Sequence, residues 1–113
     1  MQKHLFLGTI SGTSVDGLDI ALLAVEGRNE NSEISILQAD TIEFPDSLAS
    51  ELRALANPSQ GELDRLGYAD ATLGEFIGQT CRQFLTTHSL HPGAITAIGS
   101  HGQTVRHRPG KAG

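Results

Sequence analysis

The sequence predicts an α/β fold, and three observations predict it. Three apolar segments joined by short polar connections open the chain, two segments with helical spacing of apolar residues follow, and one more apolar segment comes near the end. The chain has 113 residues, of which 38% are hydrophobic and few are aromatic. One small domain with an aliphatic core is therefore expected.

The first three apolar segments have the character of strands. Residues 4–10 are mostly apolar and end at a Ser-Gly pair, and residues 18–25 are interrupted only by Asp19. Residues 33–38 alternate roughly between apolar and polar side chains. Short apolar runs bounded by glycine-rich or polar turns favour strands over helices. The tight connections predict an antiparallel meander.

Two helices are expected next. The first begins at residues 45–47, carries one apolar stripe and stops at Asn57-Pro58; the stripe consists of Leu48, Leu52 and Leu55. The second covers about residues 61–90 and ends at Pro92-Gly93. Its apolar residues fall largely on one face: Leu63, Leu66, Leu73, Phe76, Ile77, Cys81, Phe84 and Leu85. This face is expected to pack in the core, with Cys81 as a small buried hydrophobic residue.

Three glycines weaken the second helix. Gly67, Gly74 and Gly78 each cost up to about 1 kcal/mol relative to alanine in a helix interior. Such residues are usually retained for a packing reason. We therefore expect a neighbour to pack closely against the helix at these positions.

The last apolar segment, residues 94–99, is a short strand that leads into a polar loop at residues 100–104. The sequence thus has two polar, glycine-containing loops, each following a strand. In α/β sheets, strand ends commonly form the binding crevice. The closing residues 106–113 are basic, lack apolar periodicity and have the composition of a loop cut short.

The first loop, residues 11–17, has the composition of a phosphate cradle. Gly12 and Gly17 allow backbone N–H groups to approach an anion, and Thr13 and Ser14 add hydroxyl donors. Asp16 is suited to hold Mg²⁺, directly or through a water. An ordinary hairpin turn explains the same composition, so both interpretations stay open. No Walker or Rossmann motif is present.

The second loop offers His101 as a donor or acid/base and Gln103 as a partner for a sugar hydroxyl or amide. A histidine that only holds a strand-end turn through backbone hydrogen bonds is the open alternative. The other histidines are scattered along the chain and form no metal-binding pattern.

Composition excludes several classes of function. The formal charge is −5, and no Lys/Arg cluster supplies the cationic face that nucleic-acid binding needs. A single cysteine forms no intramolecular disulfide and has no zinc-site spacing around it. The beginning of the chain has too few consecutive apolar residues for a secretory signal or a membrane span. We expect a cytoplasmic protein without a nucleic-acid or membrane partner.

Together the two loops resemble the anhydro-N-acetylmuramic acid kinases of bacterial cell-wall recycling. Residues 8–19, GTISGTSVDGLD, are similar to the family's opening signature, and residues 97–107, AIGSHGQTVRH, are similar to its second one. Two such motifs in this order are far more specific than either loop alone. The stretch between them is matched only loosely.

The resemblance implies an actin-like fold of the sugar kinase/Hsp70 type, with ATP held in a cleft between two lobes. Residues 1–113 would be the amino-terminal part of the first lobe, without the second lobe. The nucleotide segment would be Gly12, Thr13, Ser14, Val15, Asp16, Gly17, Leu18 and Asp19. His101, Gly102 and Gln103 would line the sugar side. Asp16 is expected near Mg²⁺, with Asp19 the open alternative.

The implied reaction uses ATP and Mg²⁺ to phosphorylate 1,6-anhydro-N-acetylmuramic acid while water opens the anhydro bridge, giving N-acetylmuramic acid 6-phosphate. The carboxylate that activates the water belongs to a later, arginine-rich segment of the family, so residues 1–113 contain no expected catalytic residue. We therefore expect an amino-terminal fragment that is inactive alone. A homodimer of the full-length protein is a further open expectation.

Two other functions remain open. One is a small non-enzymatic module whose first loop binds an anion or a protein partner, and the other is a kinase for a different sugar in the same superfamily. A fragment would also leave a sheet edge and an apolar surface exposed, which predicts self-association or poor solubility.

Overall fold

A computed structural model describes residues 3–11, 15–27, 33–56 and 60–103. The elements in chain order are β1 (Lys3–Ser11), β2 (Gly17–Glu26), β3 (Glu33–Glu43), α1 (Asp46–Ala54), α2 (Glu62–Thr87), a short 3₁₀ turn (Pro92–Ala94) and β4 (Ile95–Gln103). This order confirms the predicted α/β class. Each predicted strand and helix is present.

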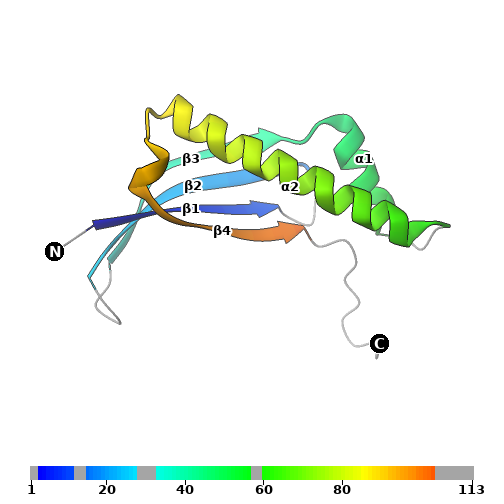
Figure 1. Ribbon diagram of the computed structural model, residues 1–113, viewed down its shortest axis with the longest axis horizontal. Helices are drawn as coiled ribbons and strands as arrows, with labels where there is room; N and C mark the ends of the chain where they lie inside the picture. Colours follow the sequence, from blue (N-terminus) through cyan, green and yellow to red (C-terminus); the bar gives the residue numbers. More distant parts are fainter. Residues whose placement is uncertain (1–2, 12–14, 28–32, 57–59, 104–113) are drawn as a thin grey trace.

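The four strands form one sheet in the order β3-β2-β1-β4. β1 pairs antiparallel with β2, and β2 pairs antiparallel with β3, so the predicted meander is confirmed. β4 lies on the other side of β1 and is parallel to it, in a register from Leu5↔Ile95 to Ser11↔Gln103. The long connection through α1 and α2 allows this parallel return. β1 and β4 therefore end at the same edge of the sheet (Figure 1).

The helices pack on one face of the sheet through two apolar clusters. One cluster joins strands β1 and β2 to the second half of α2; its buried residues are Leu7, Ile20, Leu22, Cys81, Phe84 and Leu85. The other joins the start of β2 and the end of β3 to α1 and the first half of α2; its buried residues are Val15, Leu18, Phe44, Leu48, Ala49, Leu52, Leu55, Ala69 and Leu73. Alternate residues of β2 thus face the helices, as a strand with one covered face requires.

The prediction that the apolar face of α2 is buried is wrong for its first turns. Leu63 is 80% exposed and Leu66 is 41% exposed, because α2 buries its first residue only at Ala69. The expected close packing at Gly67, Gly74 and Gly78 is also wrong for the described residues. A Cβ built at each of them meets no atom within 4 Å. Helical spacing predicts which residues share a face, but contact depends on where the sheet lies.

Both β3 and β4 are longer than predicted. β3 continues through Glu43, because its polar second half pairs with the first half of β2, from Gly17↔Glu43 to Ala21↔Ala39. β4 continues through Gln103, since its pairing with β1 reaches Ser11. The predicted loop at residues 100–104 is therefore strand up to Gln103. A neighbouring strand satisfies backbone hydrogen bonds whatever the side chains are.

Cys81 is buried in the cluster between α2 and the sheet, as predicted, and is 5% exposed. Burial raises the pKa of its thiol, because the thiolate is poorly solvated there. The reactive thiolate is therefore depleted at neutral pH. We expect labelling by iodoacetamide at pH 8 to be at least about 100-fold slower in the native chain than in urea. Equal labelling rates in the two conditions would show that α2 does not stay packed on the sheet.

Candidate functional site

The two motifs meet at one edge of the sheet. The first loop connects the end of β1 to the start of β2, and β4 ends beside β1 with Ser11 opposite Gln103. Motifs that lie about 90 residues apart in sequence are therefore neighbours in space. Figure 1 shows the arrowheads of β1 and β4 side by side at this edge. This is the type of strand-end position at which α/β sheets bind ligands.

The described part of the first loop is held by the core. Val15 has a left-handed backbone, with φ of 57°, and its side chain is buried in the cluster with α1. The N–H of Phe44 donates to the carbonyl oxygen of Asp16 at 3.3 Å, which ties the loop to the end of β3. Gly17 lies so close to β3 that a Cβ would be 2.6 Å from the carbonyl oxygen of Ile42. The glycine is thus required by close approach of a backbone.

Asp16 is the accessible charge of the loop. Its side chain is 78% exposed, and Oδ1 lies 3.6 Å from Nη2 of Arg53 on α1. The same Nη2 donates to the carbonyl oxygen of Val15 at 3.3 Å. Among the residues the structure describes, no group of three or more histidine, cysteine or acidic side chains could hold a metal. A single accessible carboxylate fits Mg²⁺ bound chiefly by phosphate oxygens and waters.

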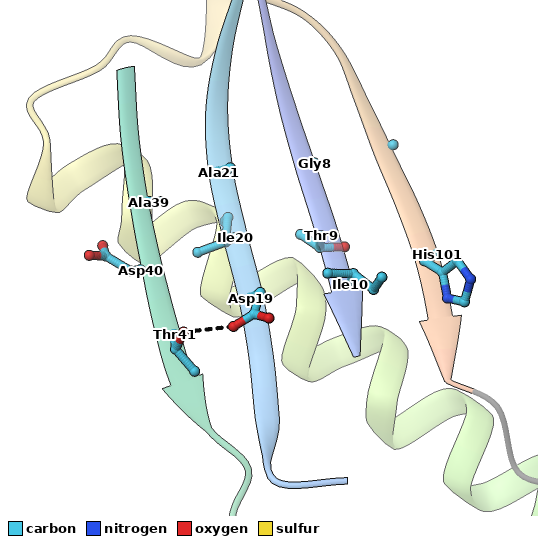
Figure 2. A pocket seen from close by; sticks show the side chains of 11 residues that line it. Gly8, Thr9, Ile10, Asp19, Ile20, Ala21, Ala39, Asp40, Thr41 and His101 are labelled. Atoms are coloured by element: carbon cyan, nitrogen blue, oxygen red, sulfur yellow. Dashed lines mark hydrogen bonds between the residues drawn. The ribbon is translucent and has the colours of Figure 1, made fainter. Parts of the chain in front are cut away.

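Asp19 projects from β2 to the face of the sheet opposite the helices, because its neighbours Leu18 and Ile20 are buried beneath them. Thr41 of β3 donates its hydroxyl to Oδ1 of Asp19 at 2.6 Å (Figure 2). The exposed position and this bond explain how an otherwise apolar strand accommodates a carboxylate.

Asp19 and His101 line the same open cavity of about 640 Å³ on this face. Figure 2 shows Asp19 on β2 and His101 on β4, with β1 between them. The lining of the cavity includes a row of small residues, one from each strand in register: Ala39, Ala21, Gly8 and Gly99. The face is hollow there because no side chain longer than a methyl group rises from that row.

The predicted site residues fall into three groups. Val15, Asp16, Gly17, Leu18 and Asp19 are described, and the side chains of Val15 and Leu18 are buried in the core, so only their backbone can face a ligand. Gly12, Thr13 and Ser14 lie outside the described residues. His101, Gly102 and Gln103 lie on the strand β4 and not on a loop, and of the last two only the backbone is described.

Sequence reasoning missed two residues of this region. Arg53 contacts the first loop from α1, and Thr41 contacts Asp19 from β3. Neither residue belongs to a motif, and each contact joins segments that are more than twenty residues apart. Only the tertiary packing brings them to the site.

None of the helices in the described ranges is both long and apolar enough to cross a membrane. 

Comparison with known proteins agrees with the two motifs. The family model described as Anhydro-N-acetylmuramic acid kinase matches residues 4–113. A protein of that name from Bordetella pertussis is 40% identical over 106 residues, which are 94% of this chain and 27% of the relative. Proteins of the same name from Pseudomonas putida and Shewanella pealeana are 38% and 37% identical, over 95% and 96% of this chain. The chain spans 28% of the length of each of these two.

Proposed function

Because the chain belongs to the anhydro-N-acetylmuramic acid kinase family, we propose that the complete gene product is a sugar kinase. It transfers the γ-phosphoryl group of ATP to O6, the bridge oxygen of 1,6-anhydro-N-acetylmuramic acid, while water adds to C1 and the C1–O6 bond breaks. Water opens the anhydro bridge in the same reaction, and the product is N-acetylmuramic acid 6-phosphate. The single observation that carries this proposal is the meeting of the two family-like motifs at one sheet edge.

The first loop takes the nucleotide side of the site in this proposal. Residues 12–19 would supply backbone N–H groups and short polar side chains to the phosphates, and Asp16 would hold Mg²⁺. When bound, Mg²⁺ offsets the charge of the phosphates. The strand–loop–strand hairpin of β1 and β2 supports this assignment, because it holds the loop between two paired strands.

His101, Gly102 and Gln103 take the sugar side, next to the end of β1. His101 is exposed on β4 and is able to donate to or accept from a sugar oxygen. Activation of the attacking water requires a carboxylate base, and the proposal gives that role to no residue among residues 1–113. The proposal includes an actin-like fold of which these residues form part of the first lobe, a cytoplasmic location and a homodimer of the complete protein.

A direct assay tests the proposal. The complete gene product is incubated with Mg-ATP and 1,6-anhydro-N-acetylmuramic acid in water enriched in ¹⁸O, and the sugar product is analysed by mass spectrometry. We expect N-acetylmuramic acid 6-phosphate carrying one ¹⁸O atom, because water opens the bridge. The 113-residue chain alone is expected to form no product, since both sides of a closed cleft are needed for phosphoryl transfer. Absence of product with the complete gene product, or phosphorylation without ¹⁸O uptake, contradicts the proposal.

A further inference from the structure

Arg53 lies at the end of α1, close to the first loop. Its neighbours Leu52 and Leu55 are buried in the same apolar cluster as Val15, so α1 and the loop share one packed core. From this helix the Arg53 side chain reaches two consecutive loop residues. It donates to the carbonyl oxygen of Val15 at 3.3 Å and lies 3.6 Å from the carboxylate of Asp16.

The backbone that Arg53 contacts is strained. Val15 is β-branched and has φ of 57°, a combination that is sterically unfavourable and persists only where the surroundings enforce it. Among the described residues, three contacts enforce it: the buried Val15 side chain, the Phe44–Asp16 backbone hydrogen bond and the Arg53 guanidinium. Of these described contacts, the guanidinium is the one that reaches both a backbone oxygen and the exposed carboxylate of the loop.

Because the peptide bond is planar, the hydrogen bond from Arg53 to the carbonyl oxygen of Val15 also fixes where the N–H of Asp16 points. In a trans peptide the carbonyl oxygen of Val15 and the N–H of Asp16 point to opposite sides of the chain, and the described residues contain no cis peptide. When Arg53 holds the carbonyl toward α1, the N–H of Asp16 points away from α1. The same guanidinium restrains the carboxylate that follows.

We propose that Arg53 is a positioning residue for the phosphates of ATP: it fixes the Val15–Asp16 peptide and the Asp16 carboxylate in the orientation that receives Mg-ATP. The inference rests on the proposed function of the first loop. In this role Arg53 acts through the loop and not by contact with phosphate or sugar. The planar guanidinium suits the role because it serves two acceptors at once, which the single ammonium group of lysine does less well.

The chain offers a matched control in Arg65 of α2. Its Nε donates to Oε1 of Glu51 on α1 at 2.8 Å, so it also anchors α1 through an arginine–acid pair. The hydrogen bond to Glu51 raises the pKa of Arg65, which remains cationic. Arg65→Gln therefore removes an arginine–carboxylate contact between α1 and α2. The Arg53 contacts to Val15 and Asp16 stay in place in this variant.

The experiment compares Arg53→Gln, Arg53→Lys and Arg65→Gln in the complete gene product. We expect Arg53→Gln to raise KM for Mg-ATP about tenfold while KM for the sugar stays within twofold, because only the nucleotide loop loses its orientation. Arg53→Lys is expected to recover part of the loss. Arg65→Gln is expected to leave both KM values unchanged. Equal Mg-ATP kinetics for Arg53→Gln and Arg65→Gln overturn the proposal.

Hydrogen exchange separates failure of this inference from failure of the proposed function. Backbone amides of residues 15–18 are expected to exchange at least about fivefold faster in Arg53→Gln than in the unmodified protein or in Arg65→Gln. Unchanged exchange overturns the positioning role whatever the activity is. If Arg53→Gln exchanges faster but the unmodified complete gene product binds no Mg-ATP, Arg53 orders the loop and the phosphate role of the loop is refuted, which removes the proposed function.

Discussion

Asp16→Asn in the complete gene product is expected to lower kcat/KM for Mg-ATP by about 100-fold. Asparagine keeps the size of the side chain but loses the negative charge that pairs with Arg53 and that we propose for holding Mg²⁺. Because the side chain is 78% exposed, the fold should tolerate the change, and the thermal midpoint should move by no more than about 2 °C. Steady-state kinetics at varied Mg²⁺ provide the measurement, and the apparent Mg²⁺ requirement should rise.

Two variants sharpen this test. Asp70→Asn removes a carboxylate from the exposed side of α2 and should leave the kinetics unchanged. Asp19→Asn tests the alternative metal ligand, whose carboxylate accepts a hydrogen bond from Thr41 on the open face of the sheet. If Asp16→Asn behaves like Asp70→Asn while Asp19→Asn loses Mg²⁺ dependence, the metal assignment belongs to Asp19.

Gly17→Ala is expected to destabilise the protein by about 1–3 kcal/mol, because the new Cβ would lie 2.6 Å from the backbone oxygen of Ile42. A backbone oxygen in a paired strand cannot move aside as a flexible side chain would. The first residue of β2 must shift away from β3, and the loop before it must shift as well. Thermal unfolding followed by circular dichroism should show a midpoint lower by on the order of 4–12 °C.

Gly8→Ala is the matched control for this prediction. Gly8 also lies in a strand of the same sheet, but a Cβ there meets no atom within 4 Å. Alanine should be neutral or stabilise the protein by up to about 1 kcal/mol, since it restricts the unfolded chain more than glycine does. Equal thermal midpoints for the two variants would refute the close approach of β2 and β3 at Gly17.

Much of the fold could be predicted from local pattern. Apolar runs between glycine-rich turns correctly predicted three strands in a meander, and i, i+3, i+4 spacing correctly predicted both helices and the burial of Leu48, Leu52 and Phe84. Leu63 and Leu66 share that spacing and are exposed, because spacing says nothing about how far the sheet extends beneath a helix. The glycines of α2 likewise face open space among the described residues.

For the candidate site too, the sequence predicts some features and tertiary packing decides the others. Its residue types and motifs, from Asp16 to His101, are properties of the sequence, because glycine content, hydroxyls and carboxylates are read directly from it. The parallel pairing of β1 with β4 decided that the motifs are neighbours and that His101 lies on a strand. Packing of α1 decided that Arg53 reaches the loop. Local sequence determines backbone preference over a few residues, whereas contacts between distant segments depend on burying the apolar faces of β1, β2 and both helices together.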